Sequence, residues 1–134
     1  MTKPQLDGKS VTAFSAWLRN CKELDSRLGY TNTNLDYMWS MYKNDKCWML
    51  IEEKRFRKGW LDFAQDKAFQ HLDSICGSDP TYRGFHLVVF EFDTPDSGWV
   101  NIDCKRVTTA QLIEFLQFKA SPEMYVSYFI KKVN

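Results

Sequence analysis

The pattern of residues 35–56, LDYMWSMYKNDKCWMLIEEKRF, predicts that two acids and a lysine lie close together. Two apolar, aromatic-rich runs flank the polar tripeptide Lys43-Asn44-Asp45, which is typical of a β-hairpin with a short loop. If the turn is centred on the middle residue of that tripeptide, Asp36 lies opposite Glu52. Side chains alternate along a strand, so Lys54 shares the face of both acids. The spacing therefore predicts two carboxylates and one ammonium at the open end of the hairpin.

This set of groups suits a divalent metal ion with a phosphate beside it. Magnesium prefers a few hard oxygen ligands and keeps several waters, so Asp36 and Glu52 suffice together with a substrate phosphate. A metal acidifies a bound water and neutralises charge that develops on a scissile phosphate, and Lys54 adds a compact cation there. The competing interpretation is an ordinary ion pair at the end of the hairpin, because isolated E-x-K triplets are common.

The register of the hairpin decides which of two adjacent glutamates is the metal ligand. Alternation places Glu53 on the face opposite Glu52, together with Ile51 and Met49. Burying an unpaired carboxylate there would be costly, so we expect Glu53 near the end of the strand, paired with an arginine or a lysine. A shift of one residue would instead place Glu53 opposite Asp36.

The whole chain predicts elements in the order α, β-hairpin, α, β-hairpin, α, β. The central hairpin is apolar on both faces, which predicts a central mixed sheet flanked by helices, and hence the α/β class. Hydrophobic spacing and breaker residues predict the other elements. These are a helix from Ser10, as N-cap, to Leu28 with Gly29 as its stop, a helix 60–76, a strand 85–92, a turn 94–98, a strand 99–107, a helix 110–118 capped by Thr108 and a strand 124–133.

Two polar residues interrupt the apolar stripes of the predicted helices. Gln65 lies inside the stripe of the helix 60–76, and Asp25 lies inside that of the first helix. We expect Asp25 either to be a local cap or salt-bridge partner, or to approach Asp36 and its neighbours.

The succession of Asp36, Glu52-Glu53-Lys54 and a helix carrying Gln65 resembles the PD-(D/E)xK nuclease superfamily. The resemblance covers residues 11–76, with the strand 85–92 continuing the sheet. It implies a restriction-endonuclease-like αβββαβ core, in a small stand-alone member of phage or bacterial type.

The resemblance also assigns roles to individual residues. It implies that Asp36 and Glu52 bind Mg²⁺ or Mn²⁺, that Lys54 is the catalytic lysine and that Gln65 is an accessory catalytic residue. Asp25 is a weak candidate for the acid that some members carry on the first helix. The chain departs from the family pattern in two ways. Leucine rather than proline precedes Asp36, and two strands rather than three are predicted before the Gln65 helix.

A basic aromatic cluster follows Lys54 directly, and it suits phosphates and a stacked base. It consists of Arg55, Arg57, Lys58 and Trp60. The competing interpretation is a solvated strand end with a half-buried tryptophan. The net charge of +1 excludes a broad electrostatic footprint for nucleic acid, so a local patch is expected. The expected partner is nucleic acid, DNA in the first instance, and cutting both strands would favour a homodimer.

A second part of the chain matches the letters of the motif more literally. Pro95-Asp96 is followed by Asp103-Cys104-Lys105, and Gln111 follows on a predicted helix. Geometry argues against a site there. Asp96 lies in a turn, and a turn centred at that point pairs Asp103 with Phe90 rather than with an acid.

Composition bounds the protein class. At 134 residues, with 44% hydrophobic and 26% charged residues, we expect a single domain in which residues 1–9 are a flexible leader. Neither a signal peptide nor a membrane span is predicted, so a cytoplasmic location is expected. The scattered cysteines Cys21, Cys47, Cys76 and Cys104 are expected to be reduced, without a zinc site, and His71 and His86 to be structural.

These observations favour a metal-dependent nuclease. The alternative is a non-enzymatic module that keeps a nuclease-like fold and binds nucleic acid or a protein. A purely structural or virion protein is a third class, suggested by the 16% aromatic content and the small size.

Overall fold

The structure is a computed structural model that describes residues 5–6, 9–10, 12–30, 33–43 and 46–133. The chain divides into two compact units, residues 1–32 and residues 33–134. Most of the expected leader and the centre of the expected hairpin turn lie outside the described residues.

The first unit contains an antiparallel pair, β1 (Gln5–Leu6) and β2 (Lys9–Ser10), followed by helix α1 (Ala13–Asn20). The expected single helix from Ser10 to Leu28 is wrong at both ends. Thr12 is the N-cap, and the α-helix stops at Asn20 before two 3₁₀ turns, η1 (Lys22–Leu24) and η2 (Ser26–Leu28). Gly29 ends the last turn with a φ of 101°, as its type predicts.

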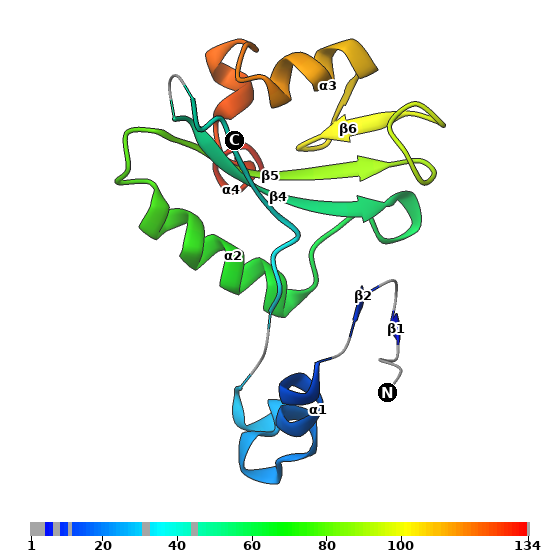
Figure 1. Cartoon of the computed structure of the whole chain (residues 1–134), viewed down its shortest axis with the longest axis vertical. Coiled ribbons are helices and arrows are strands. Elements are labelled where there is room, and N and C mark those ends of the chain that lie inside the picture. The colour runs from blue at the N-terminus through cyan, green and yellow to red at the C-terminus, as the bar shows by residue number, and fades with distance from the viewer. Residues whose placement is uncertain (1–4, 7–8, 11, 31–32, 44–45, 134) are drawn as a thin grey trace. The chain divides into compact units, whose positions relative to one another are not determined.

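A five-stranded mixed sheet in the order β3-β4-β5-β6-β7 organises the second unit (Figure 1). Only β4 and β5 are parallel, and α2 connects them. This arrangement confirms the predicted α/β class with a mixed sheet. The bounds are β3 (Tyr37–Ser40), β4 (Trp48–Arg55), η3 (Phe56–Lys58), α2 (Phe63–Cys76), β5 (Tyr82–Phe90), β6 (Val100–Ile102), β7 (Lys105–Val107), α3 (Thr109–Leu116), η4 (Pro122–Tyr125) and α4 (Tyr128–Lys131).

Helices cover both faces of β4, as its doubly apolar pattern predicts, but the expectation is wrong for the edge strand β3, whose four residues are all exposed. Figure 1 shows α3 on one side and α2 on the other. Met49 and Ile51 pack with Phe115 of α3, whereas Leu50 packs with Phe69 of α2. Successive residues of β4 therefore enter opposite layers of the core.

The predicted register of the central hairpin is confirmed. Tyr37 pairs with Ile51 and Met38 with Leu50, in antiparallel strands. Continuing this register by one residue places Asp36, which directly precedes β3, opposite Glu52.

The predicted strand 99–107 is instead a tight hairpin of β6 and β7. Asp103 and Cys104 have φ values of 50° and 70°, and two successive left-handed residues form the two-residue turn that suits the twist of a hairpin. The predicted pairing of Asp103 with Phe90 is also wrong, because Phe90 pairs with Val100.

Two C-terminal predictions have opposite outcomes. Thr108 caps α3 as expected, through a capping box with Gln111. The expected strand 124–133 is wrong, because η4 and α4 occupy that segment. Its aromatic and β-branched residues favour a strand, but the Ser127 hydroxyl caps α4 and Phe129 packs on Phe85. Tertiary burial overrides the local preference.

Among the described residues, no helix combines the length and the apolar composition that crossing a membrane requires.

Candidate functional site

Four predicted site residues, Asp36, Glu52, Lys54 and Gln65, meet in the second unit and are called the Asp36 cluster. Asp36 directly precedes β3, Glu52 and Lys54 lie on β4, and Gln65 lies in the first turn of α2. Glu52 has an exposed fraction of 0%, and the side chain of Lys54 is 19% exposed. The sheet and the start of α2 thus hold the cluster at the edge of the core.

The two acids are joined through the main chain. The Asp36 N–H donates to Glu52 Oε1 at 3.2 Å, and the Glu53 N–H donates to Asp36 Oδ2 at 2.9 Å. These bonds extend the β3–β4 pairing by one residue, with carboxylates in place of carbonyl acceptors. Each acid is therefore fixed by the strand that carries the other.

The Gln65 amide bridges the acid and the base of the E-x-K motif. Lys54 Nζ donates to Gln65 Oε1 at 2.9 Å, and Gln65 Nε2 donates to Glu52 Oε2 at 3.2 Å. Lys54 Nζ also lies 3.6 Å from Glu52 Oε2. The ammonium is held beside the carboxylate, at the predicted place on the shared face.

Asp62 fixes Gln65 and was not foreseen. Its side chain accepts from the Gln65 N–H at 2.8 Å, and Gln65 Oε1 accepts from the Asp62 N–H at 3.3 Å, which completes a capping box. The signal was present in the sequence as D-x-x-Q before an apolar run. One glutamine thus caps α2 and contacts the predicted catalytic lysine.

Glu53 lies on the other face of β4, as predicted, and forms an ion pair with Arg55. Its Oε1 also accepts a hydrogen bond from the Tyr37 hydroxyl at 3.1 Å. This bond and the charge of Glu53 raise the pKa of the Tyr37 phenol. The bond to Glu53 likewise raises the pKa of Arg55. The Glu53 carboxylate is therefore bound by Tyr37 and Arg55, on the face of β4 opposite Glu52.

Asp25 belongs to the first unit, where its carboxylate is engaged locally. It caps η2 by accepting from the Arg27 N–H at 2.8 Å, and it forms a 3.0 Å ion pair with the Arg27 guanidinium. The Arg27 side chain, with help from its backbone N–H, lowers the pKa of Asp25. This matches the expectation of a local cap and salt-bridge partner.

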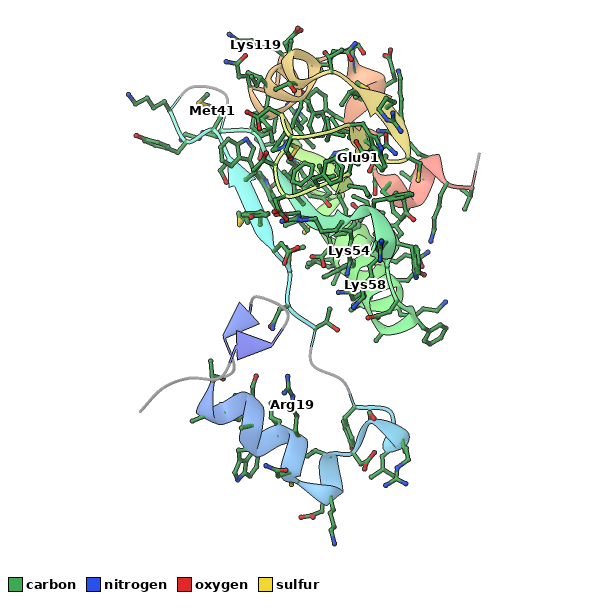
Figure 2. All side chains as sticks on the ribbon, turned by 90° about the vertical axis from the view of Figure 1, so that its right-hand side faces the viewer. Arg19, Met41, Lys54, Lys58, Glu91 and Lys119 are labelled. Atoms are coloured by element: carbon green, nitrogen blue, oxygen red, sulfur yellow. The ribbon has the colours of Figure 1, made fainter. Side chains whose placement is uncertain are left out.

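The basic aromatic cluster begins at Arg55, the last residue of β4, and continues through η3 to Trp60, before α2. Figure 2 labels Lys54 and Lys58 on the second unit. Arg57 and Lys58 are exposed, and Trp60 is 64% exposed, which excludes the half-buried tryptophan of the competing interpretation. Arg55 is less accessible to a ligand, because it pairs with Glu53 and lies 3.7 Å from Asp93.

The alternative site at Asp96 and Asp103 is not assembled. Asp96 accepts from the Thr94 hydroxyl at 2.7 Å within its own turn. Asp103 is buried elsewhere, where Oδ2 lies 2.7 Å from both His86 Nδ1 and Lys131 Nζ. Its Oδ1 accepts from the Leu87 N–H at 2.9 Å.

His86, Asp103 and Lys131 form what we call the Asp103 cluster. His86 is structural, as expected, but its partner was missed, because 17 residues separate it from Asp103 and no local pattern joins them. The second ring nitrogen, Nε2, lies 2.6 Å from the Arg83 carbonyl. Both ring nitrogens are thus occupied by the protein. The other histidine, His71, is exposed on α2.

The donor set of the Asp36 cluster fits a hard divalent cation. Its two carboxylates lie beside one ammonium, and carboxylate oxygens are the ligands that Mg²⁺ prefers. Within the described ranges, no group of three or more His, Cys, Asp or Glu side chains is placed to hold a metal ion. A metal at Asp36 and Glu52 would therefore take its remaining ligands from water and substrate. The four cysteines form no disulfide among the described residues.

No family model, no curated protein and no solved structure matches this chain.

Proposed function

We propose that this protein is a metal-dependent nuclease of the PD-(D/E)xK type, hydrolysing phosphodiester bonds of nucleic acid. The observation that carries the proposal is the bridging of Glu52 and Lys54 by Gln65, with Asp36 bonded to the same stretch of β4. An ordinary surface ion pair needs neither the second acid nor the glutamine.

The order of elements supports the same proposal. The sequence β3, β4, α2, β5 gives an antiparallel pair, a crossover helix and a strand parallel to β4. In a restriction-endonuclease-like core, this succession would supply the second, third and fourth strands with the intervening helix. The family's first core strand has no counterpart in the five-stranded sheet as described.

Asp36 and Glu52 would hold the metal ion, which when bound supplies an acidified water and neutralises charge on the scissile phosphate. Lys54 orients the attacking water and steadies a phosphate oxygen through its ammonium. Gln65 is a positioning residue in the free protein, because its Oε1 holds Lys54 Nζ beside Glu52. Burial of Glu52 excludes bulk water from the acid and strengthens its attraction for a cation.

A cleavage assay tests the activity. Purified protein is incubated with single- and double-stranded DNA and RNA in Mg²⁺ or Mn²⁺, with EDTA as the metal-free control. We expect cleavage that EDTA stops and that Lys54→Ala removes, while Lys119→Ala retains it. Lys119 is a lysine on the surface, far from the largely buried Lys54 in Figure 2. Cleavage that survives in purified Lys54→Ala would contradict the assignment.

Metal binding separates the enzyme from a non-enzymatic module with the same fold. Calorimetry with Mg²⁺ or Mn²⁺ should show binding to the intact protein and loss of binding in Asp36→Ala. If neither ion binds, or if the substitution leaves binding unchanged, the binding-module interpretation is the correct one.

A further inference from the structure

The loop between β4 and α2, residues 56–62, is anchored to the sheet directly beside Lys54. Lys54 pairs with Val89 of the parallel strand β5. A Cβ atom built on Gly59 would lie 3.2 Å from Val89 Cγ1, so the loop backbone lies directly against that side chain. Paired residues of neighbouring strands point to the same face, so the loop crosses the face that carries Lys54.

Both ends of the loop are tied to the Asp36 cluster. Gln65 Oε1 accepts from Lys54 Nζ, which precedes the loop, and from the N–H of Asp62, the last residue of the loop. Leu61 packs against the core layer that contains Leu50 and Phe69. These anchors fix the loop backbone and determine which of its side chains face outward.

The outward side chains are large aromatics interleaved with cations. Phe56, Trp60 and Phe63, at the start of α2, have exposed fractions of 60%, 64% and 79%. Arg57 and Lys58 are exposed between the first two of these rings. We call Phe56, Arg57, Lys58, Trp60 and Phe63 the aromatic rim. Three large exposed rings within residues 56–63 concentrate apolar surface in one short segment, and concentrated exposed apolar surface marks an interaction site.

Two of these rings are available to a ligand. Phe56 already contacts Trp99 edge-on, with ring centroids 5.3 Å apart. Within the described part of the chain, Trp60 has no aromatic or cation–π neighbour. Lys67 Nζ lies over the Phe63 ring, 5.6 Å from its centroid, so a cation already occupies one face of this ring, although Phe63 is 79% exposed. Trp60 and the other face of Phe63 therefore remain available for a base to stack on.

We propose that the aromatic rim binds an unpaired nucleic-acid strand, with bases stacked on Trp60 and Phe63 and phosphates beside Arg57 and Lys58. Rings that alternate with cations complement a chain in which bases alternate with phosphates. Bases inside a duplex are stacked on one another and leave no face open for these rings. The substrate class of the proposed nuclease is therefore single-stranded nucleic acid or a single-stranded segment next to a duplex. This inference rests on the proposed function for the fate of the bound strand, but binding itself requires no cleavage.

The test is fluorescence anisotropy of labelled oligonucleotides in EDTA, which prevents metal-dependent hydrolysis. The probes are single-stranded oligothymidylate, single-stranded oligouridylate and a DNA duplex of equal length. We expect tighter binding of the single strands than of the duplex. Trp60→Ala and Phe63→Ala should each weaken single-strand binding by about tenfold, the effect expected for one lost stack. Trp60→Phe should retain most of the affinity, because it keeps a ring.

Substitutions of exposed residues outside the aromatic rim test whether the loss of any exposed ring or lysine weakens binding. Tyr42 is 77% exposed in the loop that precedes β4, at the opposite end of that strand from Trp60, so Tyr42→Ala should leave binding unchanged. Lys58→Glu should weaken binding and reduce its salt dependence, whereas Lys119→Glu should do neither. Figure 2 shows Lys119 far from Lys58 on the second unit.

The result separates this inference from the proposed function. Duplex binding equal to or tighter than single-strand binding, or an unchanged affinity in folded Trp60→Ala, would overturn the aromatic rim as a single-strand site, even if the protein cleaves DNA. Ring-dependent single-strand binding without cleavage in Mg²⁺ would support the rim and refute the nuclease. Comparison of the two single-stranded probes decides between DNA and RNA.

Discussion

The Asp36 cluster and the Asp103 cluster both bury an acid next to a lysine, yet they differ in the number of acids and in hydrogen bonding. Asp103 is a single carboxylate facing one ammonium and an imidazole, with contacts of 2.7 to 2.9 Å to three donors. In the Asp36 cluster, two carboxylates face one ammonium, and the contacts to Glu52 are 3.2 to 3.6 Å. The Asp103 carboxylate is held at short distances by three groups of the protein, whereas the contacts between Glu52 and its partners in the Asp36 cluster are longer.

This difference shows why motif letters alone do not define a site. The segment around Asp103 contains the literal D-x-K, and a glutamine, Gln111, lies in the first turn of the next helix. Its aspartate nevertheless binds β5 and α4 together. A buried carboxylate satisfied by protein donors is structural, because a metal would have to displace those donors.

The largest expected effect separates Glu52 from its neighbour Glu53. Glu52→Gln should reduce metal-dependent cleavage by about a thousandfold or more, because it removes a ligand charge that stabilises the transition state. Glu53→Gln should retain most of the activity, because Glu53 lies on the opposite face with Tyr37 and Arg55. Both are assayed under the same metal conditions after circular dichroism confirms folding. An inactive Glu53→Gln with an active Glu52→Gln would reverse the assignment of the two acids.

Asp103→Asn should lower the free energy of unfolding more than Glu52→Gln does, although Glu52→Gln has the larger effect on cleavage. Asp103→Asn should lower the free energy of unfolding by about 3 kcal/mol, because all three partners of Asp103 donate and an amide nitrogen cannot accept. Glu52→Gln should cost less than half of that, because it also relieves repulsion from Asp36. Urea denaturation of both variants gives the comparison. Equal losses of stability would show that the Asp36 cluster is as structural as the Asp103 cluster.

The two capping glutamines provide a matched pair. Gln65 and Gln111 each complete a capping box, so the substitutions Gln65→Ala and Gln111→Ala should each lower the free energy of unfolding by about 1 kcal/mol. Only Gln65 also contacts Lys54, so only Gln65→Ala should reduce cleavage, by about tenfold. Thermal unfolding and initial rates measured on the same samples test both parts. A similar loss of rate in Gln111→Ala would attribute the effect to helix stability.

The smallest expected effect concerns Lys131. Its Nζ donates to Asp103 Oδ2 and to the Met124 carbonyl, but a quarter of the side chain is exposed. Lys131→Met should therefore cost only about 1 kcal/mol of stability, because Asp103 keeps its other two donors. The double variant with Asp103→Asn should lose less stability than the two single losses added together. Additive losses would mean that the two side chains do not interact.

The register of the central hairpin could be predicted because it depends on residues that are close together in the sequence. The turn residues and the alternation around Asp36 and Glu52 were enough to give the register, and hence the face of Lys54. The apolar stripe that includes Gln65 also predicted a helix over residues 60–76, where α2 lies. The capping box of Asp62 was equally local and was overlooked.

Other features depended on contacts that the sequence pattern does not display. The C-terminal segment follows the burial of Phe129 against Phe85 rather than its own strand preference. The turn at Asp103 needs two left-handed residues without glycine, and its hydrogen bonds come from β5 and α4. Because these partners are distant in the chain, neither spacing nor periodicity could reveal them.

The distances along the chain within each cluster imply an order of folding. The contacts of the Asp36 cluster close loops of 16, 13 and 11 residues, whereas His86 and Lys131 lie 17 and 28 residues from Asp103. Shorter loops cost less entropy to close, and an antiparallel hairpin needs no crossover. We therefore expect the acids and Lys54 to be in place on the β3–β4 hairpin and α2 before α4 locks onto Asp103. The proposed cleavage residues would then be assembled in the part of the sheet that forms first. The docking of α4 would come later and would slow the unfolding of the whole domain.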